Sequence, residues 1–270
     1  MLLRLLLLLL AASFGGCDRG PPFQKVEGGW RYRGVAIDVD AASFVPLDEH
    51  HAREAQRIVF VDTWRESSDW FTTQHVRVVE LAGADPKQFQ VLGGGYGRDG
   101  ARVFYEGHAF KVADVAGFEV LDDGFAHDGV QAYYLREAIA GSRGGTFHVL
   151  GWGYASDGTS AFHAAMDYAA QPPRPHVQPL RGADAASLRV LDDGYAADSR
   201  RAYYRGRLIG PAPTLRALGR GYAKTEADVY YEGERMPDAH APSFELTVAL
   251  TDDADARDAR SAFRNGRRRA

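Results

Sequence analysis

Hydrophobic and polar residues alternate in short stretches along most of this chain. A typical stretch begins with Phe118, Val120 and Leu121, continues through glycine, and ends in a second segment rich in aromatic residues. Alternation over a few residues beside glycine is typical of β-strands that bury one face. The spacing of an amphipathic helix is missing from these stretches. The pattern therefore predicts a β-hairpin in each of them.

The same unit recurs along the chain, so the sequence is a tandem array. Five clear copies carry an aromatic residue at the same place, with steps of 29, 29, 41 and 27 residues between Tyr96, Phe125, Tyr154, Tyr195 and Tyr222. Weaker copies near Phe44 and Phe244 flank them, as expected of capping repeats. We predict an all-β fold of tandem hairpin repeats of about 29 residues in a stacked or curved array.

The longest step between repeats contains a proline-rich segment, residues 171–184. Proline cannot donate a ladder hydrogen bond, so this segment is not expected in a central strand. We interpret it as an insertion or linker between a first group of repeats at 35–170 and a second group at 185–250. Residues 251–270 are expected to form a degenerate last repeat and a basic tail. We expect the end of that tail to be solvated and disordered, although it could touch anionic lipid headgroups.

The first 16 residues have the composition of an export signal, with Arg4 followed by an apolar run and small residues before the single cysteine, Cys17. This junction resembles the lipobox of bacterial lipoproteins, with Phe14 where leucine is usual. The resemblance implies cleavage before Cys17, attachment of lipid to its thiol, and a tether over residues 17–34. It places the body in the cell envelope, facing the periplasm. Asp18 resembles an inner-membrane retention signal of enteric bacteria, but other bacteria read this position differently, so the choice of membrane stays open.

The composition argues against nucleic-acid binding and against a disulfide-stabilised fold. The formal net charge is −4 with acidic and basic residues interleaved, so no basic patch for nucleic acid is expected. With one cysteine there is no disulfide framework, and stability must come from the core. No cofactor is expected.

Each unit ends in a pair of adjacent aromatic residues, here called the aromatic doublet. This ending resembles the repeat of the DKNYY family. The resemblance rests on an aspartate followed five residues later by paired aromatics, as in Asp128 with Tyr133 and Tyr134, and on GAD segments at 83–85 and 182–184. It covers roughly residues 35–245. The Lys and Asn of the family's name are replaced by Gly129 and Val130 in one copy. The family is a repeat of undefined biochemical function, so the resemblance implies a fold and no activity.

Several acidic and glycine-rich patterns could suggest ligand chemistry. The spacing of Gly95, Gly97 and Gly100 matches a dinucleotide-binding loop, but sibling copies lack it and a strand follows instead of a helix. The pairs Asp122–Asp123 and Asp192–Asp193 precede glycine, as turn residues do, and lack calcium-loop spacing. We therefore expect no metal site. A further acidic cluster comprises Asp252, Asp253, Asp255 and Asp258.

His50 and His51, beside Asp48 and Glu49, come nearest to an acid–base cluster, but adjacent residues diverge on either a helix or a strand. No zinc-hydrolase or serine-hydrolase motif is present. We therefore expect no catalytic residues and no enzymatic activity. Since catalytic groups can converge from distant segments, a hydrolase of envelope polymers that uses the repeat aspartates remains the alternative.

The aromatic doublets suggest a binding surface. Adjacent strand residues face opposite sides, so one member of each doublet should enter the core. The other members could form a row that stacks on sugars or docks a protein, and they are Tyr105, Tyr134, His163, Tyr204 and Tyr231. Alternatively both members are structural and lie between repeats. We expect a non-enzymatic envelope lipoprotein with a protein or glycan partner, in a sharper version an immunity protein that neutralises an exported toxin.

Overall fold

The computed structural model describes residues 20–66, 70, 73–211, 214–247 and 254–269, so Cys17 lies outside the described residues. The described chain is all-β, with short 3-10 turns and no α-helix. It forms two compact units, Met1–Pro86 and Lys87–Ala270. The predicted fold class, an all-β array of tandem hairpin repeats, is confirmed.

The first unit contains a three-stranded and a four-stranded antiparallel sheet. The strands are β1 (Phe23–Val26), β2 (Gly29–Tyr32) and β3 (Val35–Ile37), then β4 (Val45–Pro46), β5 (His51–Arg53), β6 (Ile58–Trp64) and β7 (His75–Glu80). Strands β1 and β2 lie inside the segment predicted as a tether. Phe23 and Tyr32 are buried there against Phe44, which explains why this segment is folded.

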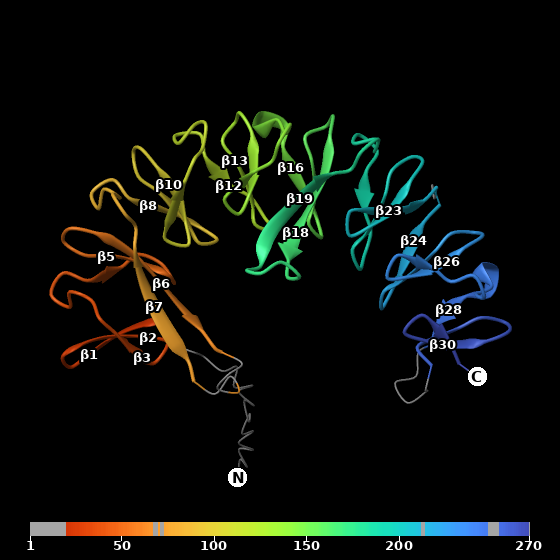
Figure 1. Cartoon of the computed structure of the whole chain (residues 1–270), viewed down its shortest axis with the longest axis horizontal. Coiled ribbons are helices and arrows are strands. Elements are labelled where there is room, and N and C mark those ends of the chain that lie inside the picture. Colours follow the sequence, from red (N-terminus) through yellow and green to blue (C-terminus); the bar gives the residue numbers. More distant parts are fainter. Residues whose placement is uncertain (1–19, 67–69, 71–72, 212–213, 248–253, 270) are drawn as a thin grey trace, which may run out of the picture. The chain divides into compact units, whose positions relative to one another are not determined.

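The second unit consists of six four-stranded sheets, each an antiparallel meander in sequence order (Figure 1). The first three comprise β8 (Gln90–Gly93), β9 (Tyr96–Arg98), β10 (Val103–Tyr105) and β11 (His108–Phe110); β12 (Glu119–Val120), β13 (Phe125–His127), β14 (Ala132–Tyr134) and β15 (Glu137–Ala138); and β16 (His148–Gly151), β17 (Tyr154–Ser156), β18 (Ala161–Asp167) and β19 (Arg174–Pro179). The short 3-10 turn η2 (Gly144–Thr146) precedes β16.

The last three sheets follow the same plan. They comprise β20 (Arg189–Val190), β21 (Tyr195–Ala197), β22 (Ala202–Tyr204) and β23 (Arg207–Gly210); β24 (Arg216–Gly219), β25 (Tyr222–Lys224), β26 (Val229–Tyr231) and β27 (Glu234–Arg235); and, after the 3-10 turn η3 (Ala241–Ser243), β28 (Glu245–Leu246), β29 (Ala256–Arg257), β30 (Ala262–Arg264) and β31 (Arg267–Arg268). The two segments predicted for one hairpin, such as those that form β12 and β14, are therefore part of a four-stranded meander in each repeat.

The arginine-rich end is folded in the part that the structure describes. Arg264, Arg267 and Arg268 lie on the two strands of the last hairpin, paired as Arg264 with Arg267 and Phe263 with Arg268. Phe263 is buried against Phe244. The expectation of a disordered basic tail was wrong for these residues, because the aromatic side chain of Phe263 anchors the hairpin.

The proline-rich segment forms strand β19, which pairs with β18 from Phe162↔Pro179 to Asp167↔Arg174. It is the edge strand of its sheet, and an edge strand tolerates proline because one side of its backbone makes no ladder bonds. Strands β18 and β19 have seven and six residues, while the matching strands of neighbouring repeats have only two to four. The inserted segment is therefore a long hairpin within a repeat (Figure 1).

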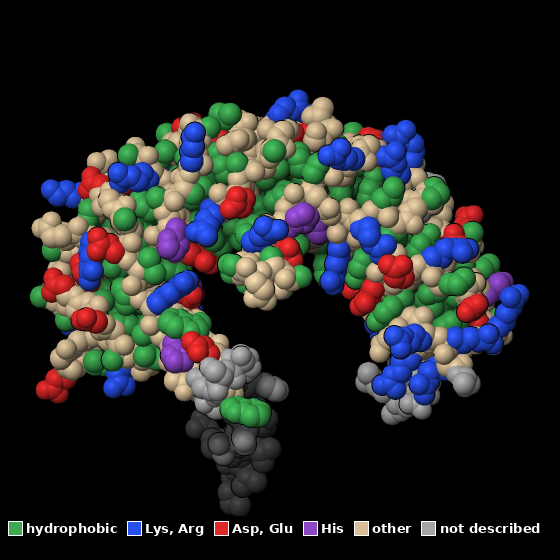
Figure 2. Space-filling view, in the orientation of Figure 1, with side chains coloured by type: hydrophobic (Ala, Val, Ile, Leu, Met, Phe, Trp, Pro, Cys, Tyr) green, Lys and Arg blue, Asp and Glu red, His purple; other side chains and the backbone are tan. Residues whose placement is uncertain are grey.

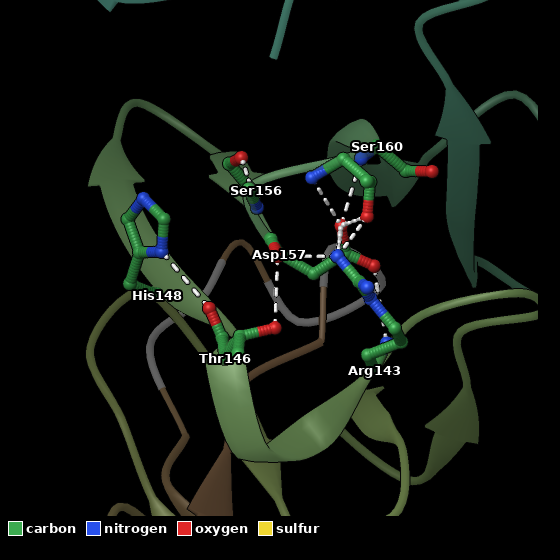
Figure 3. A network of polar contacts seen from close by, with 8 residues as sticks. Arg143, Thr146, His148, Ser156, Asp157 and Ser160 are labelled. Atoms are coloured by element: carbon green, nitrogen blue, oxygen red, sulfur yellow. Dashed lines mark hydrogen bonds and ion pairs between the residues drawn. The ribbon is translucent and has the colours of Figure 1, made fainter. Parts of the chain in front are cut away.

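Two devices repeat inside the second unit, and the first uses the aspartate of each turn. The Oδ1 atom of Asp157 accepts hydrogen bonds from the N–H groups of Thr159 and Ser160 at 2.9 and 2.7 Å, while Oδ2 accepts one from Arg143 N–H at 3.1 Å (Figure 3). Asp128, Asp198 and Asp258 make the same set of bonds. Each of these aspartates lies in the turn between the two central strands of its repeat.

The second device links neighbouring repeats through a tyrosine hydroxyl. The Tyr195 hydroxyl donates to Gly221 O at 2.8 Å and accepts from Gly233 N–H at 3.0 Å, and both groups belong to the next repeat. Tyr154 bonds Gly194 O and Gly206 N–H in the same way. Repeats in this unit are therefore joined by hydrogen bonds as well as by buried rings.

Candidate ligand-binding groove

The aromatic doublets do not form an open row. Tyr134, His163 and Tyr204 are only 9, 6 and 8% exposed, while Tyr105 and Tyr231 are partly buried. Each packs on the first aromatic ring of its own repeat, as Tyr204 does on Tyr195 at 4.8 Å between ring centroids. A Cβ placed on Gly233 would meet the Tyr204 ring, so the next repeat lies against it. Both doublet members thus have structural contacts, as the alternative interpretation expected.

Exposed aromatic side chains gather elsewhere in the second unit. Trp152 is 52% exposed and Tyr168 is 76% exposed. Trp152 occupies the first position of the β16–β17 turn with φ of 53°, a left-handed conformation that a bulky side chain rarely adopts. The other repeats place small, acidic or basic residues at this position, and these are Gly94, Asp123, Asp193 and Arg220. A strained, exposed tryptophan therefore stands in one repeat at a turn position where the other repeats fold without one.

Trp152 and Tyr168 line one groove of about 660 Å³. Trp152 comes from the β16–β17 turn, and Tyr168 from the loop that joins β18 to β19. Strand β19 adds His176 and Gln178, and the β22–β23 turn adds Arg205. The long hairpin therefore forms one wall of the groove, and Figure 2 shows basic, acidic and histidine side chains around its projecting end.

The charges of the groove come from Arg205 and Asp123. The Arg205 guanidinium lies 5.3 Å from the centroid of the Tyr204 ring. In the part of the chain that the structure describes, no carboxylate lies within ion-pair distance of Arg205, whereas Arg207 and Arg235 pair with Glu234 and Asp228 at 2.7 and 2.6 Å. The Oδ2 atom of Asp123 accepts a long hydrogen bond of 3.5 Å from Gly153 N–H.

His163 forms part of the groove floor and stays neutral at neutral pH. Burial, together with smaller contributions from the nearby charges of Arg205 and His176, lowers the pKa of His163 to about 4. Its ring packs edge-on against Tyr154 at 4.7 Å. An incoming ligand would therefore meet the Arg205 guanidinium beside a neutral imidazole ring.

The histidine cluster near Asp48 is a turn closed by hydrogen bonds. The His51 side chain is fully buried, and its Nδ1 lies 3.1 Å from both Asp48 carboxylate oxygens. Burial alone would raise the pKa of Asp48, but hydrogen bonds from the His51 ring and from the N–H groups of His50 and His51 lower it to about 2. The His50 ring stacks on Phe60. The cluster has the geometry of a closed turn and not of a solvent-facing acid–base pair.

The glycine and acidic patterns of the sequence have structural roles where the structure describes them. Gly95 forms a β-turn and Gly97 lies on β9 under the Phe89 ring, so the glycine spacing does not open a helix. Asp252 and Asp253 lie outside the described residues, while the Asp255 Oδ1 accepts the Tyr222 hydroxyl at 2.7 Å. No group of three or more metal-ligating side chains occurs among the residues that the structure describes. No helix of the described chain is long and apolar enough to cross a membrane.

The repeats were compared with known protein families. The model of the DKNYY family matches residues 38–166. This match supports the resemblance of the repeats to that family over the matched segment. The matched DKNYY segment ends within β18 and includes Trp152, but not β19 or Arg205. The later repeats continue the same strand order, from β20 to β31. No curated protein and no solved structure matches the chain.

Sequence reasoning missed Trp152, Tyr168 and Arg205 because it followed what the repeats share. A signal was nonetheless present: aligning the repeats puts Trp152 opposite Asp123 and Asp193. Where one repeat has a residue that the other repeats lack, the shared fold does not require that residue. Such departures, rather than the repeated tyrosines, mark the groove.

Proposed function

We propose that this protein is a non-enzymatic lipoprotein of the bacterial cell envelope that binds a protein or glycan partner through the groove beside Trp152. Cys17 and the export signal before it support the anchor, because small residues precede the cysteine at the end of a short apolar run. The lipid on Cys17 would hold the body on the periplasmic side of a membrane. The proposal holds for an anchor in either the inner or the outer membrane.

The exposed tryptophan carries the proposal of binding. A tryptophan with positive φ costs free energy in the folded state, and its large apolar surface gains nothing while it faces water. Siblings with Asp123 or Asp193 at the same turn show that the repeat folds without it. A ligand that covers the ring would offset both costs, since buried aromatic rings dominate many binding interfaces.

An enzymatic role for the repeat aspartates is less favoured. Asp128, Asp157 and Asp198 are nearly fully buried, and both oxygens of each accept backbone hydrogen bonds. Hydrogen bonds from N–H groups outweigh burial and lower the pKa of all three carboxyls. A general acid requires a proton at neutral pH, and these groups hold none.

In vivo crosslinking of the full lipidated protein, followed by mass spectrometry of what co-purifies, tests the proposal. We expect a partner that is lost from Trp152→Asp and retained by Val130→Asp, a matched control at another exposed apolar residue. Cys17→Ala should release the protein from the membrane fraction. Equal recovery of every partner with Trp152→Asp, or no partner at all, would overturn the binding proposal. Membrane retention of Cys17→Ala would overturn the anchor.

A further inference from the structure

We propose that the groove takes a glycan whose sugar carries a carboxylate, with Trp152 and Tyr168 against sugar rings and Arg205 on the carboxylate. This inference rests on the proposed binding function and names the ligand for it. Three properties of the groove fit this one chemical class. These are exposed ring faces, an available guanidinium, and polar groups that require hydrogen-bonding partners.

The aromatic walls fit a ligand with flat apolar faces. Trp152 and Tyr168 are 52 and 76% exposed and approach the groove from separate loops. A pyranose ring has an apolar face of C–H groups and a rim of hydroxyls, so it can cover an aromatic ring without losing its polar contacts to water. The tyrosine hydroxyl and the indole N–H remain free to bond to such a rim.

Arg205 favours an anionic group on that ligand. Its guanidinium has donors arranged to bind a carboxylate in a bidentate manner, and in the described structure it lacks the carboxylate partner that Arg207 and Arg235 have. The Tyr204 ring beneath holds its position. His163 is buried and neutral beside it, so this ring adds no positive charge to that of Arg205.

Asp123, His176 and Gln178 exclude simpler anions. Asp123 brings a carboxylate to the same groove, which would repel an anion that has no hydrogen-bond donor, such as an ionised fatty acid. Covering these side chains with an apolar peptide would leave them without hydrogen bonds, which is costly. A sugar acid supplies hydroxyl donors for Asp123 and Gln178 together with a carboxylate for Arg205. The groove volume of about 660 Å³ lies in the range of small-ligand sites.

Calorimetric titration of the full chain with a matched pair of disaccharides tests the inference. The acidic probe is N-acetylglucosaminyl-N-acetylmuramic acid, and the neutral probe is di-N-acetylchitobiose, which lacks the lactyl carboxylate. We expect the acidic probe to bind about tenfold more tightly or better, as a charge-assisted pair requires. Digalacturonic acid, with its carboxylate on the ring, distinguishes the two sources of a sugar carboxylate.

Three variants locate the effect. Arg205→Gln should lower affinity for the acidic probe to that for the neutral one, and Trp152→Asp should abolish binding of both. Val130→Asp should bind as the wild type, and circular dichroism should show all three folded. Equal affinity for acidic and neutral probes, or an acidic preference that survives Arg205→Gln, would overturn the inference. Failure of all three sugars to bind would also overturn it.

If none of the sugars binds but a protein partner is crosslinked in a Trp152-dependent manner, the proposed binding function stands and only its glycan ligand is rejected.

Discussion

Single hydroxyls and carboxylates hold neighbouring repeats together. The tyrosine that bridges to the next repeat is replaced by Phe125 in one copy, and its hydrogen bonds have no counterpart at that junction. In the first unit the Tyr32 hydroxyl instead bonds the His50 ring at 2.9 Å. Both exceptions precede a repeat with a long hairpin, β18–β19 or β6–β7, in place of the short hairpin whose turn supplies the N–H donor elsewhere. The hydrogen bonding at this position therefore differs where the following repeat differs.

Tyr195→Phe should lower the free energy of unfolding by about 1 to 3 kcal/mol, because Gly221 O and Gly233 N–H lose their shared partner in a buried place. Urea denaturation followed by far-ultraviolet circular dichroism measures it. Tyr168→Phe is the matched control, since its hydroxyl is at an exposed site. A loss no greater than that of the control would mean that water replaces the bridge.

Asp48 should make stability depend on acid. Its folded pKa is lowered from 3.8 to about 2, so its contribution is fully present above pH 4 and is lost as pH falls toward 2. For a carboxylate that is 26% exposed, the contribution is about 1 kcal/mol after solvent screening. Asp48→Asn should reduce stability at pH 7 and flatten its decline between pH 4 and 2. Urea midpoints at several pH values measure this, and an unchanged slope would contradict it.

At the scale of elements, most turns serve the fold, whereas the turn at Trp152 and the long hairpin β18–β19 form the proposed binding groove. Turns with two successive positive φ values recur through the array, as at Asp193 and Gly194 with φ of 56 and 79°. Such turns match the twist of antiparallel strands and favour Asp, Asn or Gly. Trp152 violates this preference in one turn, and β18–β19 extends beyond its neighbours in the same repeat.

Trp152→Asp should stabilise the protein by roughly 0.5 to 1 kcal/mol, because aspartate suits the left-handed turn better than tryptophan does. Thermal unfolding should show a higher Tm for this variant. The sign matters, since most substitutions of large residues destabilise. A lower Tm would mean that Trp152 contributes packing to the fold, and its loss of ligand binding would then have a structural explanation.

Shortening the long hairpin should leave the sheet intact. Ala165 pairs with His176, so residues 166–175 can be replaced by Asn-Gly, a two-residue turn that closes this register. We expect unfolding free energy within about 1 kcal/mol of wild type, because the removed part lies beyond the short strands of sibling repeats. Ligand binding should disappear with Tyr168. Unfolding of the shortened protein would instead make the hairpin part of the core.

The sequence predicted the strands well because repetition shows the same alternation several times. It could not predict β19, since proline excludes a central strand and the sequence does not say that this strand lies at an edge. It also could not predict the burial of Tyr134 and Tyr204, because alternation assigns a face but not what covers that face. The next repeat covers it, and the sequence pattern of one repeat contains no sign of that contact.

The whole molecule depends on neighbour contacts, so its ends matter. Tyr222 is fully buried, and its hydroxyl bonds Asp255 and Gly266 of the last repeat. The Tyr222 ring also packs on Phe244 at 5.5 Å. The last repeat therefore covers apolar surface that the array would otherwise present to water, as capping repeats do.

Removing residues 237–270 should lower Tm and cause self-association, because the ring of Tyr222 and the side chain of Leu218 lose their cover. Light scattering coupled to size-exclusion chromatography measures the association. Removal of residues 1–19 alone is the control and should leave both properties unchanged. A monomeric, equally stable truncated protein would show that the repeat before the last is itself a sufficient cap.

The tyrosine bridge also sets an order of events in time. Tyr154 and Tyr195 find their partners 40 and 38 residues further along the chain, at Gly194 and Gly233. Synthesis proceeds from the N-terminus, so each repeat remains incomplete until its successor has emerged. Folding would then advance as a front that trails the growing chain by one repeat. The exposed ring at that front is a transient surface for a chaperone, and it is covered again at every step.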